Sequence, residues 1–179
     1  MRHPVDGALV HGLVASLDGL WEHDSRRFDA VVARDWPATD GAGYVEAVAG
    51  DPDAVLLALR VGGAVHGHLV GRFAPADSFR RVPVAVLESM QVSTALRGAG
   101  SGSALLGAFV GWARGRGTQA LSVTATAAND GARRFSASHG FTEQSVTYRR
   151  WLVPPPAGDD TVVPDAGLVA RGSREDLDT

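Results

Sequence analysis

Large apolar residues recur at helical spacing in the first part of the chain. Between residues 6 and 20, just after Pro4, they return every three or four positions, which predicts an amphipathic helix. They are Leu9, Val10, Leu13, Val14, Leu17 and Leu20. Ser25 and Asp40 are the predicted N-caps of two shorter helices. The residues that these helices are expected to bury are Phe28, Val31 and Val32 in the first and Tyr44, Val45 and Val48 in the second.

From residue 54 onward, the pattern changes to short apolar runs that alternate with amphipathic stretches. Residues 54–61 and 64–73 form two such runs around Gly62-Gly63, a pair that is typical of a β-hairpin turn. Further strands are predicted at 84–92, 119–126 and 145–153, and helices at 101–114 and 129–139. This order of elements predicts an α/β fold with a mixed central β-sheet flanked by helices.

Composition changes abruptly near the C-terminal end. Residues 154–179 begin with three prolines and hold six acidic residues against two arginines, so we expect a disordered acidic tail after one domain at 1–153. The whole chain of 179 residues has a net charge of -3, but residues 1–153 hold 15 arginines against 14 acidic residues. This nearly neutral domain argues against nucleic acid as a partner.

Several residue types are missing from the chain. Without cysteine, disulfides, thiolate nucleophiles and zinc-thiolate sites are excluded, and without lysine, Walker A phosphate binding and Schiff-base catalysis are excluded. Isoleucine is also absent and Asn129 is the only asparagine, a bias that fits a GC-rich bacterial coding sequence. Neither a run of 18 apolar residues nor a leader sequence is present, so we expect a cytoplasmic protein that binds no membrane.

The segment 97–103, Arg-Gly-Ala-Gly-Ser-Gly-Ser, lies between a predicted strand and a predicted helix. Glycines let the backbone turn sharply and direct several N–H groups into one concavity, and the start of a helix adds a partial positive charge. The segment therefore predicts an anion site that suits phosphate. A flexible glycine-rich connection is the alternative, whereas the spacing G-x-G-x-G does not match the Rossmann fingerprint.

Arg97, Gly100 and Gly102 match the motif Q/R-x-x-G-x-G/A, and here the chain resembles the GCN5-related N-acetyltransferase (GNAT) family. Three further segments resemble that family in the same order. Residues 87–92 resemble its fourth strand, 129–132 the start of its next conserved helix, and 135–141 its closing segment. The resemblance implies a GNAT-like acyl-CoA N-acyltransferase fold, acetyl-CoA as the co-substrate, and transfer of its acetyl group to an amine.

The resemblance also implies a role for each part of the cofactor site. The residues that would cradle the CoA pyrophosphate are Arg97, Gly98, Ala99, Gly100, Ser101, Gly102 and Ser103. The backbone of Met90, Gln91 and Val92 would pair with the pantetheine amides, and Asn129 would contact the pantetheine arm. A helix N-cap is the alternative role of Asn129, and the two roles are compatible. No metal site is expected, because His66 and His68 share a strand face without a third ligand at suitable spacing.

Transfer of acetyl to an amine needs a group that removes the amine proton. Glu88 matches the position of that base in many GNAT members, and strand alternation predicts that it shares a face with Val86 and Met90, among apolar neighbours. A salt-bridged strand glutamate without a catalytic role is the alternative. Ser136 replaces the tyrosine that protonates the CoA sulfur in many relatives, so we expect a water bridging from Ser136, or Tyr148, to supply that proton.

The resemblance places the early helices at the mouth through which the acceptor enters. Residues 18–53 hold nine acidic residues against three arginines, which favours a cationic acceptor: a polyamine, an aminoglycoside-like compound or a basic peptide terminus. Solvated helix faces and helix caps are the alternative role of these acids. Trp21 is the tryptophan that we expect to line the acceptor pocket.

The sequence therefore predicts an acyltransferase that moves acetyl directly from acetyl-CoA to a primary amine of a small molecule or peptide. Direct transfer is expected because the chain has no cysteine for an enzyme-bound thioester. Two alternatives stay open: a non-catalytic acyl-CoA-binding or sensing module, suggested by Ser136, and a protein that binds another nucleotide in its glycine loop. A homodimer that pairs through the last strands is also expected.

Overall fold

The computed structural model of the chain describes residues 6–27, 31, 33 and 35–153. The predicted tail, and the predicted core residues Phe28 and Val32, lie outside these residues. The helices are α1 (Gly7–Arg27), α2 (Trp36–Gly50), α3 (Ser101–Gly115) and α4 (Asp130–Ser138), with a short 3-10 helix, η1, at Thr94–Leu96. The strands are β1 (Ala54–Val61), β2 (Ala64–Ala74), β3 (Val84–Val92) and β4 (Ala120–Val123).

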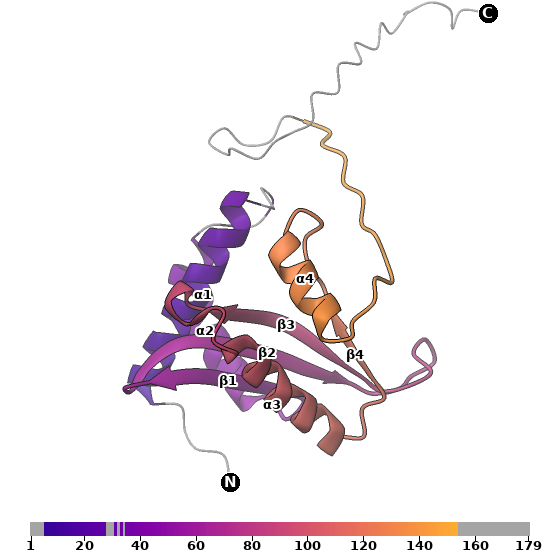
Figure 1. Cartoon of the computed structure of the whole chain (residues 1–179), viewed down its shortest axis with the longest axis horizontal. Helices are drawn as coiled ribbons and strands as arrows, with labels where there is room; N and C mark the ends of the chain where they lie inside the picture. The colour runs from indigo at the N-terminus through magenta and orange to yellow at the C-terminus, as the bar shows by residue number, and fades with distance from the viewer. Residues whose placement is uncertain (1–5, 28–30, 32, 34, 154–179) are drawn as a thin grey trace, which may run out of the picture.

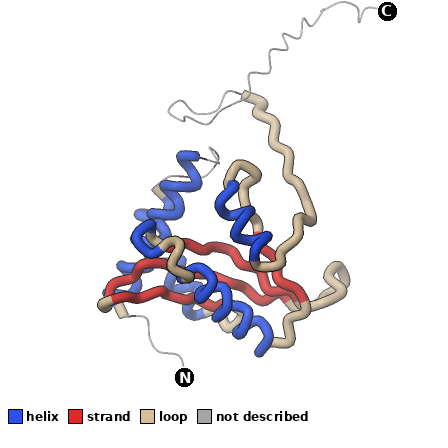
Figure 2. Tube along the Cα trace, viewed as in Figure 1, coloured by secondary structure: helices blue, strands red, loops and turns tan. Residues whose placement is uncertain are grey.

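The strands form one sheet in the order β1-β2-β3-β4. Strand β2 is antiparallel to both β1 and β3, whereas β3 and β4 are parallel. Helix α3 covers one face of this sheet, and α1 and α2 cover the other (Figures 1 and 2). The mixed central sheet flanked by helices that the sequence predicts is confirmed.

The predicted hairpin is confirmed in its turn and its register. Val61 lies opposite Ala64, and Gly62 and Gly63 between them have φ of 58° and 87°. Positive φ at both central residues is the geometry of the tight turns that match the twist of a hairpin, and glycine adopts it without steric strain.

Both predicted internal N-caps are wrong. Helix α1 continues through Ser25 to Arg27, and α2 begins at Trp36, so Asp40 lies inside it. Asp35 occupies the cap position of α2, and Pro37 follows in its first turn, where a residue without an N–H is well tolerated. Burial of Val45 and Val48 is confirmed. Among the described residues, no helix has the length and apolar composition needed to cross a bilayer.

The predicted last strand at 145–153 is also wrong. These residues are an extended loop that leads away from the sheet (Figure 2), and Tyr148 is 90% exposed. Within the described part of the chain, β4 pairs only with β3. An alternating apolar pattern shows that a segment could fit a sheet, but pairing also requires a strand edge within reach. The expected homodimer stays a prediction.

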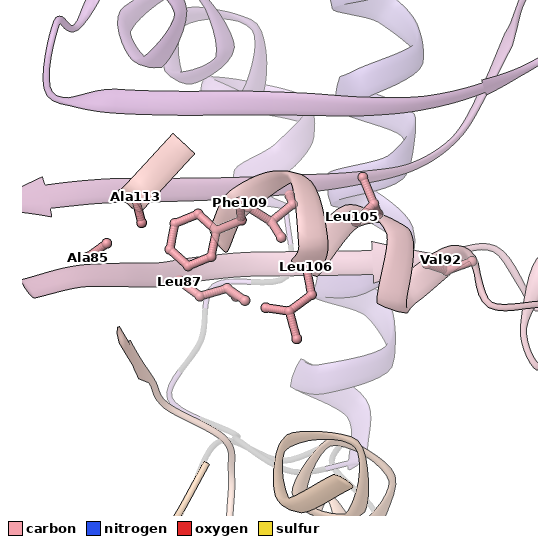
Figure 3. Close-up of a cluster of buried hydrophobic side chains, with 8 residues drawn as sticks. Ala85, Leu87, Val92, Leu105, Leu106, Phe109 and Ala113 are labelled. Carbon is pink, nitrogen blue, oxygen red and sulfur yellow. The ribbon is translucent and has the colours of Figure 1, made fainter. Parts of the chain in front are cut away.

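The larger core lies between α3 and the sheet (Figure 3). Phe109 of α3 is fully buried there with Leu69, Ala85 and Leu106. Gly71 of β2 faces the Phe109 ring, and a Cβ atom at Gly71 would come 2.2 Å from Phe109 Cε2. The absence of a side chain at residue 71 is therefore what allows Phe109 to lie against the sheet.

A polar contact crosses the smaller core, between α1 and the sheet. His68 of β2 is fully buried, and its Nδ1 and Nε2 atoms lie 2.7 Å from Ser16 Oγ and Ser89 Oγ. Burial lowers the pKa of His68 from 6.5 to about 4, because the charged imidazolium is poorly solvated there. The ring is therefore neutral at pH 7.

We predict that Gly71→Ala lowers the free energy of unfolding by about 1–3 kcal/mol, because the Phe109 ring must move out of a packed core. Urea denaturation measures this change. Gly111→Ala is the matched control: Gly111 lies on α3 with nothing within 4 Å of an added Cβ, so stability should rise by about 0.5–1 kcal/mol. Equal effects of the two substitutions would contradict the packing argument.

We also predict a loss of stability in mild acid. An unfolded chain protonates histidine near pH 6.5, whereas folded His68 does so near pH 4, so the unfolded state binds more protons between these values. Stability therefore falls as the pH decreases through that range, by about 3 kcal/mol in total from this group. In His68→Gln, the free energy of unfolding, measured by urea denaturation at pH 7, 5.5 and 4.5, should depend less on pH than in the wild type. An unchanged pH dependence would refute the assignment of this effect to His68.

Candidate active site

A cleft of about 720 Å³ opens where β3 and β4 part. The parallel pairing of these strands ends at Leu87 and Val123. Beyond that point, the cleft is lined by the end of β3, the residues after β4, the loop before α3, and α4. Leu20 and His23 of α1 also line it. Segments far apart in the sequence thus meet at one place on the sheet.

A β-bulge lies at the same point on β3. Val70 of β2 faces Ser89, but the next residue, Gly71, faces Leu87, so Glu88 is an extra residue without an opposite partner. Leu87 packs in the α3 core, whereas Ser89 contacts His68 on the α1 face. The bulge is what brings the side chains of Glu88 and Ser89 to the same face.

The predicted surroundings of Glu88 need correction. Met90 packs toward α3, whereas Glu88 accepts a hydrogen bond from Arg72 Nε at 2.8 Å on the opposite face. Strict strand alternation predicted one shared face, and the bulge breaks that alternation. The Glu88 side chain is 32% exposed and is paired with the Arg72 guanidinium, so it does not lie among apolar neighbours. The salt bridge of the alternative interpretation is present.

Arg72 joins two carboxylates beside the cleft. It pairs with Glu88 and with Asp51, the residue that follows α2. The hydrogen bond from Arg72 to Glu88 is the main cause that raises the pKa of Arg72. Burial, and next the negative charge of Glu88, raise the pKa of Tyr44, a half-buried residue of α2. Two carboxylates from different elements thus share one guanidinium beside the cleft.

The glycine loop has the shape that an anion site requires. Gly98 and Gly100 have φ of 78° and 81°, and Gly100 is the residue that caps α3. The first N–H groups of an α-helix have no partner within the helix, so those of α3 are available beside the loop. Arg97 Nε donates to the carbonyl oxygen of Val92 at 2.9 Å, which ties the loop to the end of β3.

The loop residues that line the cleft are Arg97, Gly98, Gly100, Gly102 and Ser103. Ala99 and Ser101 are not among the lining residues. A Cβ at Gly102 would lie 3.2 Å from Phe135 Cε2, so glycine lets α3 and α4 come close here. Ser103 Oγ lies 2.9 Å from His139 Nε2, a second link between the two helices.

The end of β3 is a strand edge that faces the cleft. Met90, Gln91 and Val92 all line it, and among the described residues this part of β3 pairs only with β2. Every second peptide unit of a strand directs its N–H and C=O groups toward one side. The backbone between residues 88 and 92 can therefore pair with an extended ligand that lies in the cleft.

Asn129 lines the cleft and caps α4. Its side-chain oxygen accepts from the Ala132 N–H at 3.0 Å, so the N-cap role considered for it is present. Ser136 is half-buried on α4 and also lines the cleft. Tyr148, the alternative proton donor, lies outside the cleft lining on an exposed loop.

The prediction that Trp21 lines the acceptor pocket is not supported by the cleft lining. Trp21 is not among the residues that line the cleft; its ring stacks on Trp36 at 4.7 Å between centroids. Leu20 and His23, one residue before it and two after, do line the cleft. The described residues contain no cluster of three or more acidic or histidine side chains that could bind a metal ion.

Sequence reasoning missed Ser89, Leu20 and His23 as cleft residues. Ser89 is the only small polar residue of β3, next to Glu88, which was a signal of a special position. Leu20 belongs to the apolar stripe of α1, and nothing in that pattern separates cleft from core. The bulge determines that Ser89 lies on the same face of the sheet as Glu88, and no residue type in the sequence predicts a bulge.

Residues 17–141 match the acetyltransferase (GNAT) family model. No curated protein matches the sequence. Among solved structures, a tetramutant of the BH1408 protein from Bacillus halodurans has a TM-score of 0.71 at 15% identity, with 79% of this chain and 93% of that chain covered.

Two solved acetyltransferases are also similar. The aminoglycoside acetyltransferase meta-AAC0020, from an uncultured soil metagenomic sample, has a TM-score of 0.60 at 15% identity, covering 80% of this chain and 88% of its own. AAC(6')-Iy, in complex with a bisubstrate analog, CoA-S-monomethyl-acetylneamine, has a TM-score of 0.59 at 18% identity, covering 79% and 91%. These likenesses confirm the predicted fold, and the family match establishes that the chain belongs to the acetyltransferase (GNAT) family and is an acyltransferase.

Proposed function

We propose that this protein transfers acetyl from acetyl-CoA directly to a primary amine of a small molecule or peptide. One observation carries the proposal: the free edge of β3 and the glycine loop before α3 line the same cleft. An edge that pairs with amides and a helix start that binds an anion match the two polar parts of CoA. The same two parts would sit at opposite ends of one extended ligand.

The cofactor roles follow from this arrangement. The pantetheine arm has peptide-like amides, and these would pair with the backbone of Met90, Gln91 and Val92 as an added strand pairs with an open sheet edge. The N–H groups at 98–103 would bind the pyrophosphate, with Arg97 beside them. The Asn129 side chain already caps α4 and would contact the pantetheine arm from that position.

Glu88 is the proposed general base. Its carboxylate lies at the point where β3 and β4 part, where the thioester end of a bound cofactor would emerge. A water or the Glu88 carboxylate itself would take the amine proton as the new N–C bond forms. Since a free thiol has a pKa of about 8.5, the thiolate leaves readily and a water held by Ser136 would return its proton.

The proposed acceptor is cationic. Glu88 lines the cleft, and its carboxylate can pair with an ammonium group that enters there. The similar structure meta-AAC0020 is an aminoglycoside acetyltransferase, and aminoglycosides are polyamines, which agrees with that class of acceptor. The proposal also includes a homodimer, supported by the exposed apolar side chains of Val146, Tyr148 and Leu152, which a partner would cover.

The cofactor site is tested by Gly100→Ala. Gly100 has a φ of 81°, a region that costs a side-chain-bearing residue about 1–2 kcal/mol, so the loop should relax away from its present shape. We expect acetyl-CoA to bind roughly tenfold more weakly in isothermal titration calorimetry. Gly107→Ala is the control, because an added Cβ on this exposed face of α3 meets nothing within 4 Å. Equal affinities would place the pyrophosphate elsewhere.

The base is tested by Glu88→Gln. Removing a general base should lower kcat by about 10²–10⁴-fold and leave the Kd for acetyl-CoA unchanged. Asp51→Asn is the matched control, since it breaks the other ion pair of Arg72 at a residue outside the cleft lining. If both variants lose activity equally, the ion-pair cluster is structural. If the wild type binds acetyl-CoA and acetylates no amine in a broad panel, the protein is a binding module.

A further inference from the structure

A chain of polar side chains runs from α1 through the buried His68 to the cleft. Its first member is Gln91, whose carboxamide lies against α1 between the Ser16 carbonyl and the Leu20 N–H. A carbonyl only accepts and a backbone N–H only donates, so the Gln91 oxygen accepts from Leu20, at 3.2 Å, and its NH₂ group faces Ser16. That NH₂ group donates to Ser16 Oγ, also at 3.2 Å.

This orientation allows the next hydrogen bonds to run from Ser16 toward Ser89. Gln91 occupies one lone pair of Ser16 Oγ, and the Ser16 hydroxyl hydrogen can be directed to His68 Nδ1, which lies 2.7 Å away. His68 is neutral at pH 7, since burial lowers its pKa to about 4, and a neutral imidazole has one donor and one acceptor nitrogen. With Nδ1 accepting, Nε2 carries the hydrogen and donates to Ser89 Oγ at 2.7 Å.

Ser89 is the end of this chain and lines the cleft. When His68 Nε2 donates to its oxygen, the Ser89 hydroxyl hydrogen is available for a partner in the cleft. Ser89 follows Glu88 at the bulge, and both side chains lie on the α1 and α2 side of the sheet. A hydroxyl donor therefore lies next to the proposed base.

We propose that Ser89 is a further catalytic residue, whose hydroxyl donates a hydrogen bond to the thioester carbonyl oxygen as that oxygen gains negative charge. The inference rests on the proposed acetyl transfer. The amine nitrogen forms a bond to the carbonyl carbon, the carbonyl electron pair moves to oxygen, and collapse of this intermediate breaks the C–S bond. The amine proton goes to Glu88, the thiolate takes a proton from water, and Ser89 keeps its hydrogen throughout.

His68 and Ser16 are positioning residues in this arrangement. They do not touch the substrate; they hold Ser89 Oγ as an acceptor on its buried side, so that its hydrogen is directed into the cleft. Preorganised donors of this kind stabilise developing charge without reorganising during the reaction. The direction of the hydrogen bonds from Gln91 to Ser89 thus matters as much as the contacts themselves.

The first test measures the tautomer of His68 without any substrate. Long-range ¹H–¹⁵N NMR of uniformly ¹⁵N-labelled protein at pH 7 distinguishes an Nε2–H imidazole from an Nδ1–H imidazole. We expect Nε2–H for His68 in the wild type. An Nδ1–H ring would mean that Ser89 donates to His68 instead, and the proposal would be overturned whatever the activity.

The second test compares serine variants in steady-state kinetics and in acetyl-CoA binding. Ser89→Ala should lower kcat by about 10- to 100-fold with the Kd for acetyl-CoA unchanged, since one donor to an oxyanion is lost. Ser16→Ala should give a smaller loss of kcat and a mixture of His68 tautomers, and Ser16→Thr, which keeps the hydroxyl, should restore both. A merely structural role of Ser16 would not move the tautomer.

Ser93→Ala is the control. Ser93 follows β3 directly, its hydroxyl is buried without a hydrogen-bond partner, and it is outside the cleft lining, so kcat should stay at the wild-type value. Wild-type kcat in Ser89→Ala would overturn the inference and leave the proposed function intact. A wild type that acetylates no amine would refute the proposed function, and the tautomer would still report whether the polar chain is directed as we infer.

Discussion

The extra residue at Glu88 is the constraint on which the site depends. Up to Leu87, β3 pairs with strands on both sides, and beyond the bulge it pairs, within the described part of the chain, only with β2. Backbone N–H and C=O groups are costly to leave without partners when water is excluded. A ligand with amides of its own can supply those partners, so the place where β3 and β4 part suits the extended, amide-bearing cofactor that we propose.

Polar contacts on either side of the bulge fix its side chains. Toward the start of β3, Arg72 holds Glu88 and connects it to the end of α2 through Asp51. Toward its end, His68 holds Ser89 and connects it to α1 through Ser16. Helix α1 and the end of α2 are thus attached to β3 at adjacent residues. A shift of either helix would move a side chain in the cleft.

The sequence was sufficient where a local cause determines the structure. Gly62-Gly63 specified a turn, the glycine loop specified a strand-to-helix bend, and Asn129 specified a cap, because each follows from the conformations open to those residues. The sequence was insufficient where the cause is tertiary. The facing of Glu88 depends on how β2 and β3 align, and pairing of residues 145–153 depends on an edge elsewhere.

Charge counted along the sequence overstates the acidity of the cleft mouth. Of the nine acidic residues at 18–53, Asp51 and Asp53 form ion pairs with Arg72 and Arg116, arginines that lie outside that segment. Asp51 and Glu88 share the Arg72 guanidinium, so neither carboxylate is an isolated charge. At physiological ionic strength, exposed charges are screened over about 8 Å, so the Glu88 carboxylate acts mainly on groups that are already in the cleft. Selection for the proposed cationic acceptor would therefore depend on contact with Glu88 and its neighbours, and attraction from a distance would contribute little.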